Sequence, residues 1–308
     1  MVPEMTKYYQ KFSDFLVQKY GQKVWKISLD AGLSCPNCDS DGKEGCIFCR
    51  NDSFSPMGTS EYKSITRQMQ GGIAFAQKRW GIKKYIAYFQ SSTNTFAPVN
   101  ELERLYHEAI AQKDVVAISI ATRPDCLPPK VIDLIQSLTS KVDVWIELGL
   151  QSSFDDTLKI INRGHTFQDY KNAVEALKKI NVRICTHIMI GLPGESRTHI
   201  KKTAQRISSN GTHEVKIHPL LILKGTPLES MHQQGRIAPL SMDEYVSLAV
   251  DFVEMLPPDM VIQRLTAESQ KDLLIEPQWC TNKLRVLSAI DAEFEKRGSR
   301  QGECYKTA

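Results

Sequence analysis

The chain has 308 residues, of which 42% are hydrophobic and 24% charged, a balance typical of a folded globular protein. It has no apolar run of the ~20 residues that cross a bilayer, and its first ten residues lack the apolar stretch of a secretory signal, so we expect a cytoplasmic protein with no membrane partner. The formal net charge of +4 permits a polyanionic partner without requiring one.

Strand-like and helix-like segments alternate along the first 225 residues. Apolar runs rich in β-branched and aromatic residues predict six strands, at residues 24–29, 85–90, 115–122, 144–150, 182–190 and 214–223. Helical spacing is clearest between them at residues 61–80, 100–112, 129–140, 167–180 and 198–209. Because such alternation forms parallel βαβ units, we expect an α/β fold, a partial parallel (β/α)6 barrel over residues 24–225. Functional side chains then gather at the carboxyl ends of the strands.

The alternation fades beyond residue 225. Helical patterns at residues 241–255 and 282–297 are closed by Pro257-Pro258 and by Gly298. We therefore expect residues 226–308 to form a C-terminal helical extension packed on the barrel, and residues 1–23 to form a separate N-terminal segment.

Four of the eight cysteines follow the first predicted strand closely: Cys35, Cys38, Cys46 and Cys49. Thiols clustered in a reducing compartment indicate metal or redox chemistry rather than disulfides. Two Cys-x-x-Cys pairs suit tetrahedral zinc, although the spacing between the pairs is shorter than in a usual zinc ribbon. An iron–sulfur cluster is the other interpretation, held either by all four thiolates, as in ferredoxins, or by three with one iron left open.

Several further segments match one known family. They are Tyr88 to Pro98, Thr122-Arg123-Pro124-Asp125, Glu147 to Ser152, Asn162-Arg163-Gly164-His165 and Gly191-Leu192-Pro193-Gly194-Glu195. Together with the Cys-x10-Cys-x2-Cys spacing, they make the chain similar to radical S-adenosylmethionine (SAM) proteins of the Elongator-catalytic-subunit-like branch, YtqA/YhcC-type. The resemblance implies a [4Fe–4S] cluster on Cys35, Cys46 and Cys49 with SAM on the open iron. Cys38, where relatives often carry another residue, is the alternative to Cys35.

The resemblance also implies where SAM binds. Arg163 is expected to pair with the SAM carboxylate, and Gln151 to bond its ribose or carboxylate. The expected cofactor-binding residues are Phe48, Gln90, Ser91, Ser92, Thr122, Arg123, Gln151, Arg163, His187 and Met189. Phe48 and His187 have core residues as their alternative interpretation.

Two ionisable residues, Glu147 and Arg123, fall in or at the ends of predicted buried strands and need partners there. They either pair with each other or contact SAM or substrate. Glu147 is one candidate catalytic residue. Cys280 is the other, with a buried structural thiol as its alternative.

The resemblance implies a tRNA substrate, in which a carboxymethylaminomethyl group on the wobble uridine becomes aminomethyl. A flavodoxin or ferredoxin is the implied electron donor, and a methyltransferase acts downstream. RNA contacts through phosphate and base stacking are expected from Tyr245, Trp279, Lys283 and Arg285. Another radical SAM reaction on RNA or on a small molecule, and a zinc-binding RNA module, remain as alternatives.

Overall fold

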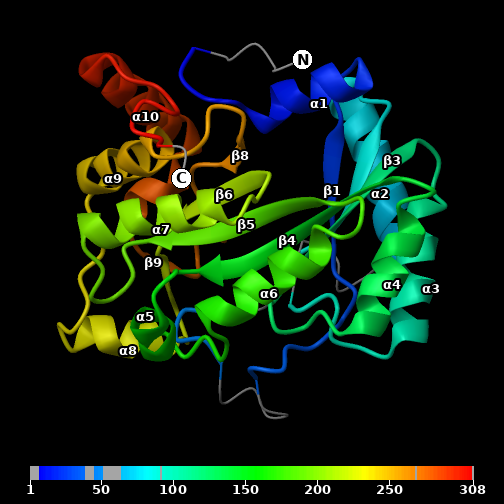
Figure 1. Ribbon diagram of the computed structural model, residues 1–308, viewed down its shortest axis with the longest axis horizontal. Helices are drawn as coiled ribbons and strands as arrows, with labels where there is room; N and C mark the ends of the chain where they lie inside the picture. The colour runs from blue at the N-terminus through cyan, green and yellow to red at the C-terminus, as the bar shows by residue number, and fades with distance from the viewer. Residues whose placement is uncertain (1–6, 39–44, 51–63, 91, 268, 307–308) are drawn as a thin grey trace.

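Seven parallel strands form one curled sheet that runs through the middle of the molecule (Figure 1). The computed structural model describes residues 7–38, 45–50, 64–90, 92–267 and 269–306. In order across the sheet, the strands are β1 (Trp25–Leu29), β2 (Tyr85–Phe89), β3 (Val115–Thr122), β4 (Asp143–Gln151), β5 (Arg183–Ile190), β6 (Glu214–Pro219) and β8 (Val261–Arg264). The α/β fold and the six predicted strands are confirmed, and each of these strands neighbours the next one along the chain.

Helices connect the strands and cover the outer face of the sheet (Figure 1). The connecting helices are α2 (Ile65–Trp80), α3 (Val99–Ile110), α4 (Pro129–Leu138), α5 (Asp155–Ile160), α6 (Phe167–Leu177) and α7 (Arg197–Ser209). The predicted helices match α2, α3, α4, α6 and α7 within a few residues, except that residues 61–63 lie outside the described residues.

The C-terminal region packs on one end of the sheet. It contains α8 (Pro227–Gln233), α9 (Met242–Glu254), a 3-10 turn η3 (Gln278–Thr281) and α10 (Lys283–Arg297). The two helices predicted there correspond to α9 and α10, which pack against each other. Among the described residues, no helix is long and apolar enough to cross a membrane.

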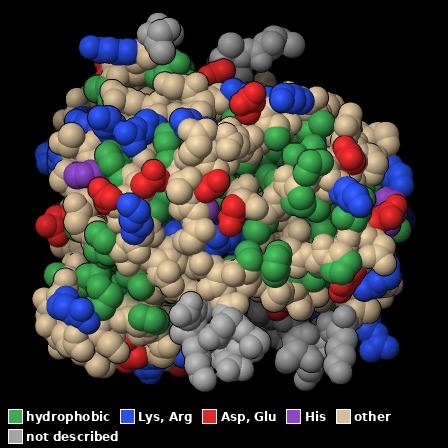
Figure 2. Space-filling model, turned by 60° about the horizontal axis from the view of Figure 1, so that its bottom comes forward, with side chains coloured by type: hydrophobic (Ala, Val, Ile, Leu, Met, Phe, Trp, Pro, Cys, Tyr) green, Lys and Arg blue, Asp and Glu red, His purple; other side chains and the backbone are tan. Residues whose placement is uncertain are grey.

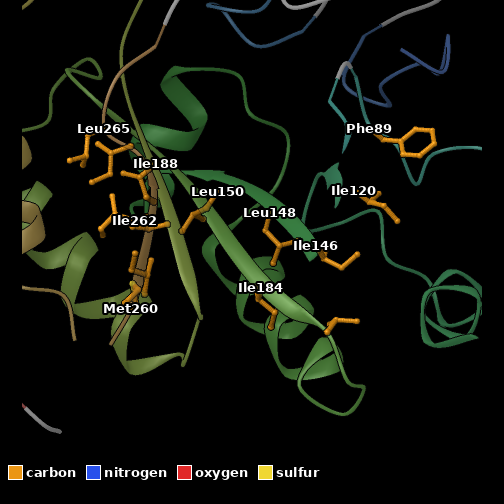
Figure 3. Close-up of a cluster of buried hydrophobic side chains, with 14 of the residues drawn as sticks. Phe89, Ile120, Ile146, Leu148, Leu150, Ile184, Ile188, Met260, Ile262 and Leu265 are labelled. Atoms are coloured by element: carbon orange, nitrogen blue, oxygen red, sulfur yellow. The ribbon is translucent and has the colours of Figure 1, made fainter. Parts of the chain in front are cut away.

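Side chains of the strands alternate between an apolar outer face and a polar inner face. On β4, Ile146, Leu148 and Leu150 belong to the apolar cluster shown in Figure 3, whereas Glu147 and Gln151 line an interior cavity. The main hydrophobic core therefore lies between the sheet and its helices, which leaves the inside of the curl free for polar groups.

An N-terminal helix, α1 (Phe12–Tyr20), lies at the amino end of the sheet (Figure 1). Its Leu16 packs with Ile86, Ala117 and Trp145, and the ring of Phe12 meets Trp145 edge-on with 6.2 Å between centroids. This packing closes the amino end of the curled sheet. The cavity therefore lies at the carboxyl ends of the strands.

Two elements differ from the sequence expectation. The seventh strand, β8, was not predicted, and it pairs in parallel with β6 although it comes from beyond residue 225. The strand predicted over residues 214–223 divides near Pro219, because proline has no amide hydrogen to continue the ladder. Its last two residues form β7 (Ile222–Leu223), which pairs antiparallel with β9 (Leu274–Glu276).

Candidate functional site

A single cavity at the carboxyl ends of the strands gathers most of the predicted site residues. Nine of the ten predicted SAM residues line it, and the tenth, Ser91, lies outside the described residues. The nine are Phe48, Gln90, Ser92, Thr122, Arg123, Gln151, Arg163, His187 and Met189. They converge from the ends of four strands, β2 to β5, from the segment after α5, and from the loop that carries Cys35 to Cys49, called the cysteine loop below. This convergence makes the cavity the candidate site.

The cysteine loop forms one wall of the cavity, where Cys35 and Cys49 lie on its lining. Cys46 is buried, and its Sγ accepts hydrogen bonds from Asn37 Nδ2 at 3.4 Å and from Arg163 Nη1 at 3.5 Å. Burial, followed by the neighbouring thiols of Cys46 and Cys38, raises the pKa of Cys49 to about 12. The four thiols thus lie near one another, although residues 39–44 of the same loop are outside the described part of the chain.

The described residues contain no group of three His, Cys, Asp or Glu side chains already arranged as a metal site. The contacts of the loop nevertheless fit an iron–sulfur cluster. Two N–H groups donate to the sulfur of Cys46, and hydrogen bonds to sulfur are a principal means of tuning such clusters.

Arg163 is held against the fourth strand by the backbone of Gly149. Its Nη2 and Nε donate to the Gly149 carbonyl at 2.7 and 3.2 Å. A Cβ on Gly149 would lie 2.7 Å from Nη2, closer than real contacts allow, so only glycine lets the guanidinium sit there. Three of the five N–H groups of Arg163 donate to the Gly149 carbonyl and to Cys46 Sγ, which leaves two for a ligand.

Gln151 lies next to Arg163 on the cavity wall, and its backbone φ is +73°. Its Oε1 is buried and has no hydrogen-bond partner among the residues that the structure describes. A buried acceptor of this kind needs a donor. The hydroxyl groups of a bound ribose would supply one, so this wall fits SAM.

Gly164 brings the loop after β4 against the cysteine loop. Its φ is +75°, and a Cβ there would overlap Oδ1 of Asn37. Asn37 also donates to the carbonyl of Asn162 at 2.6 Å, while Asn162 donates to the carbonyl of Gly45 at 2.7 Å. These contacts fix the two loops to each other.

Arg123 pairs with Asp125 and not with Glu147. Its Nε and Nη2 reach the two carboxylate oxygens of Asp125 at 3.0 and 2.8 Å, and its Nη1 donates to the carbonyl of Arg163 at 2.7 Å. Of the two interpretations of Arg123 and Glu147, the mutual ion pair is therefore wrong, and contact with SAM or substrate stays a prediction.

Glu147 lies fully buried at the floor of the cavity, where Lys26 and Lys216 both form ion pairs with it. Ser119 Oγ donates to it at 2.6 Å, and His187 Nε2 lies 2.7 Å from its second oxygen. Burial alone would raise the pKa of Glu147, but Lys216, Lys26 and His187 outweigh it and hold that pKa well below its ordinary value.

The pKa values of the basic groups around Glu147 are lowered, whereas an acidic partner raises the pKa of an exposed base. Burial lowers the pKa of His187 to about 4 and that of Lys216 to about 7, despite the raising effect of Glu147. Burial, with the charge of Arg264, also lowers the pKa of His218 well below its ordinary value. Both imidazoles are consequently neutral at neutral pH.

Sequence reasoning missed several residues of this floor. Lys216, His218 and Tyr88 all line the cavity, as does Arg264 on the unpredicted strand β8. The available signal is alternation within β6, where Glu214, Lys216 and His218 alternate with the apolar Val215 and Ile217.

Of the predicted substrate residues, Tyr245 belongs to the core, and the half-buried Trp279 packs against it. Tyr245 is fully buried, its hydroxyl donates to the carbonyl of Leu265 at 2.9 Å, and its ring packs 5.1 Å from that of Trp279. The indole N–H of Trp279 in turn donates to the carbonyl of Leu240 at 2.9 Å. The burial of Tyr245 contradicts its predicted contact with RNA, and Trp279 does not line the cavity.

The remaining candidates lie outside the cavity lining. Cys280 is buried in an apolar cluster with Leu221, Leu223 and Ala267, three residues that do line the cavity, so its thiol is behind the wall. Burial raises its pKa to about 12. Lys283 and Arg285 are exposed on the first turn of α10.

Comparisons with known proteins agree with this geometry. The family described as the Radical SAM superfamily matches residues 35–207, and the Radical_SAM C-terminal domain matches residues 212–296. The chain is 40% identical to YtqA of Bacillus subtilis over 97% of this chain and 94% of that protein. It is 31% identical to a tRNA uridine(34) acetyltransferase of Methanocaldococcus infernus, over 53% of this chain and 30% of that protein.

A solved structure shows the same fold. The archaeal Elp3 of Methanocaldococcus infernus superimposes with a TM-score of 0.69 at 21% identity, over 90% of this chain and 64% of that one.

Proposed function

Because the chain belongs to the radical SAM superfamily, in its Elongator-like branch, we propose that it modifies the wobble uridine of tRNA, converting a carboxymethylaminomethyl group to aminomethyl. The cofactors of this family are a [4Fe–4S] cluster and SAM. The observation that carries the proposal is the cavity in which the cysteine loop meets Gln151 and Arg163.

Different residues of that cavity bind the cluster and SAM. Cys35, Cys46 and Cys49 hold the cluster, while Arg163 offers its two remaining N–H groups to the SAM carboxylate. Gln151 accepts from the ribose through its unpartnered Oε1. When bound, the cluster supplies the electron that splits SAM into methionine and a 5′-deoxyadenosyl radical.

The chain then orients the substrate and keeps water out. Phe48 and Met189, which line the cavity and pack in one apolar cluster, shield the adenine side. The neutral imidazoles of His187 and His218 and the buried Glu147 form the polar floor toward which the modified side chain extends.

The tRNA substrate is supported by the similarity to a protein named for uridine 34 of tRNA. On the face shown in Figure 2, Lys and Arg side chains are interleaved with Asp and Glu, so the described residues there form no continuous basic surface. The exposed Lys283 and Arg285 are the residues proposed to contact the phosphates. A flavodoxin or ferredoxin supplies electrons, and a methyltransferase acts on the product.

Nucleoside analysis of a deletion strain tests this function. We expect carboxymethylaminomethyl-uridine to accumulate and methylaminomethyl-uridine to fall in bulk tRNA, with both restored by the wild-type gene. An unchanged profile of the two nucleosides would reject the proposed substrate.

Anaerobic purification separates the proposal from a zinc-binding RNA module. We expect a brown protein whose visible absorbance bleaches with dithionite. A colourless protein that contains zinc would reject the redox cluster.

A further inference from the structure

The floor of the cavity includes one cation, Arg264, that has no carboxylate partner among the described residues. Lys26 and Lys216 share one carboxylate, that of Glu147, and Arg264 lies on the cavity lining beyond them. No other carboxylate among the described residues lines the cavity, and His187 and His218 are neutral there. Excess charge in a partly buried site is costly unless a counter-charge arrives with the ligand.

Arg264 is the cation best placed to meet such a ligand. It ends β8 and is aligned with Lys216 by the parallel register of the two strands. It has no hydrogen bond or ion pair within the described part of the chain, and its side chain is solvent-accessible at the cavity. After burial, the charge of Arg264 is the strongest influence that lowers the pKa of His218, so the guanidinium lies close to the cavity floor.

Lys216 is held rigidly beside it. Its Nζ is paired with Glu147, donates to the hydroxyl of Tyr88 at 3.1 Å and lies 4.4 Å from the centre of the Tyr88 ring. Lys26 lies 3.9 Å from the centre of the same ring. Glu147, Tyr88 and Lys26 therefore hold Lys216 in place. An anion can bind beside Arg264 without a rearrangement of Lys216.

The anion recognised here belongs to the substrate rather than to SAM. Arg163, proposed to hold the SAM carboxylate, comes from the segment after β4 beside the cysteine loop, whereas Arg264 and Lys216 come from β8 and β6 at the other edge of the sheet. A guanidinium fork suits the planar geometry of a carboxylate. The proposed substrate carries one carboxylate, on the carboxymethyl group that is removed.

We propose that Arg264, with Lys216 beside it on the neighbouring strand, binds the carboxylate of the substrate's carboxymethyl group and so selects that group for reaction. This inference rests on the proposed function for the identity of the substrate. It assigns Arg264 a role in specificity that acts by direct contact with the substrate.

A matched pair of RNA probes tests this assignment. One anticodon stem-loop carries carboxymethylaminomethyl-uridine, and the other carries its neutral carboxamide, so the two differ in one charge and share every phosphate. Binding is measured by fluorescence anisotropy with anaerobic holoprotein and SAM, without reductant, so that no turnover occurs. For the wild type we expect the acid to bind about tenfold more tightly than the amide.

Variants locate the source of that preference. Arg264→Gln should reduce it to less than about twofold, Arg264→Lys should retain part of it, and Arg79→Gln, an exposed arginine on α2, should leave it unchanged. A tenfold preference that survives Arg264→Gln, or a wild type that binds both probes equally, would overturn the assignment.

The nucleoside profile of the deletion strain separates this inference from the proposed function. An Arg264-dependent acid preference with an unchanged profile would support the carboxylate subsite and reject the proposed reaction. An altered profile without the preference would support the reaction and reject the subsite.

Discussion

Nη1 of Arg163 donates to Sγ of Cys46 at 3.5 Å, although 117 residues separate the two along the chain. The same guanidinium donates to the carbonyl of Gly149 on β4. The side chain proposed to hold the SAM carboxylate is therefore fixed both to the sheet and to the cysteine loop. If Arg163 holds SAM as proposed, this arrangement positions SAM relative to the cluster before either binds.

Gly149→Ala should weaken SAM binding about tenfold while leaving the fold intact. The added Cβ would lie 2.7 Å from Nη2 of Arg163 and would push the guanidinium away from the Gly149 carbonyl. Calorimetric titration with SAM measures the effect, and circular dichroism monitors folding. Gly71→Ala is the matched control, because a Cβ at Gly71 meets nothing within 4 Å, and an unchanged affinity in Gly149→Ala would contradict the role of this contact.

Cysteine variants should distinguish the three cluster ligands from Cys38, which is expected not to bind iron. Replacing Cys35, Cys46 or Cys49 by Ala should abolish the cluster, and Cys38→Ala should spare it. Iron content and visible absorbance of anaerobically purified protein are the measurements. If Cys38→Ala lost iron and Cys35→Ala kept it, the third ligand would be Cys38.

Glu147→Gln should destabilise the protein by about 3–5 kcal/mol, because it leaves the buried Lys216 and the half-buried Lys26 without their carboxylate. Denaturant unfolding measures the change in the free energy of unfolding. Glu175→Gln, which removes an exposed ion pair with Lys179 on α6, should have little effect. Equal decreases in the free energy of unfolding of the two variants would show that Glu147 contributes no more to stability than the exposed Glu175.

Stability should fall as the pH drops from 6.5 towards 4, in part through His187. Burial lowers the pKa of its folded-state imidazole from 6.5 to about 4, so over this range the unfolded chain takes up a proton that the folded chain refuses. The contribution is at most about 1.4 kcal/mol per pH unit, and it is absent above pH 6.5, where both states are neutral.

Urea unfolding at pH 7 and pH 5 measures this contribution. His187→Gln should lose less stability than the wild type between the two pH values, since glutamine does not titrate. Identical losses in the two proteins would assign the pH dependence to other groups, such as His165, whose pKa burial also lowers to about 4.

The strand pattern was sufficient to predict six strands because their outer faces form one continuous apolar core. It was not sufficient for β8, a strand of only four residues that ends in Gln263 and Arg264 and joins the sheet through tertiary pairing with β6. Short strands of this kind carry too little periodicity to be distinguished from a loop.

The site could be predicted only where its residues lie in recognisable motifs. Gln151 and Arg163 were found in this way, whereas Lys216 and Tyr88 lie within apolar strands and show their role only once the inner face is known. The partner of Glu147 was mistaken because strand register decides it. Glu147 is paired with Ala121, so Arg123 lies two residues further on, just beyond the end of β3, and reaches Asp125 instead.

The most direct test of the account is the reaction itself with purified protein. Bulk tRNA from the deletion strain, SAM and reductant are combined anaerobically with wild-type protein or with Cys46→Ala, and nucleosides and 5′-deoxyadenosine are quantified together. We predict that the wild type converts carboxymethylaminomethyl-uridine to aminomethyl-uridine as 5′-deoxyadenosine forms, and that Cys46→Ala does neither. Formation of 5′-deoxyadenosine by the wild type with no loss of carboxymethylaminomethyl-uridine would contradict the proposed function.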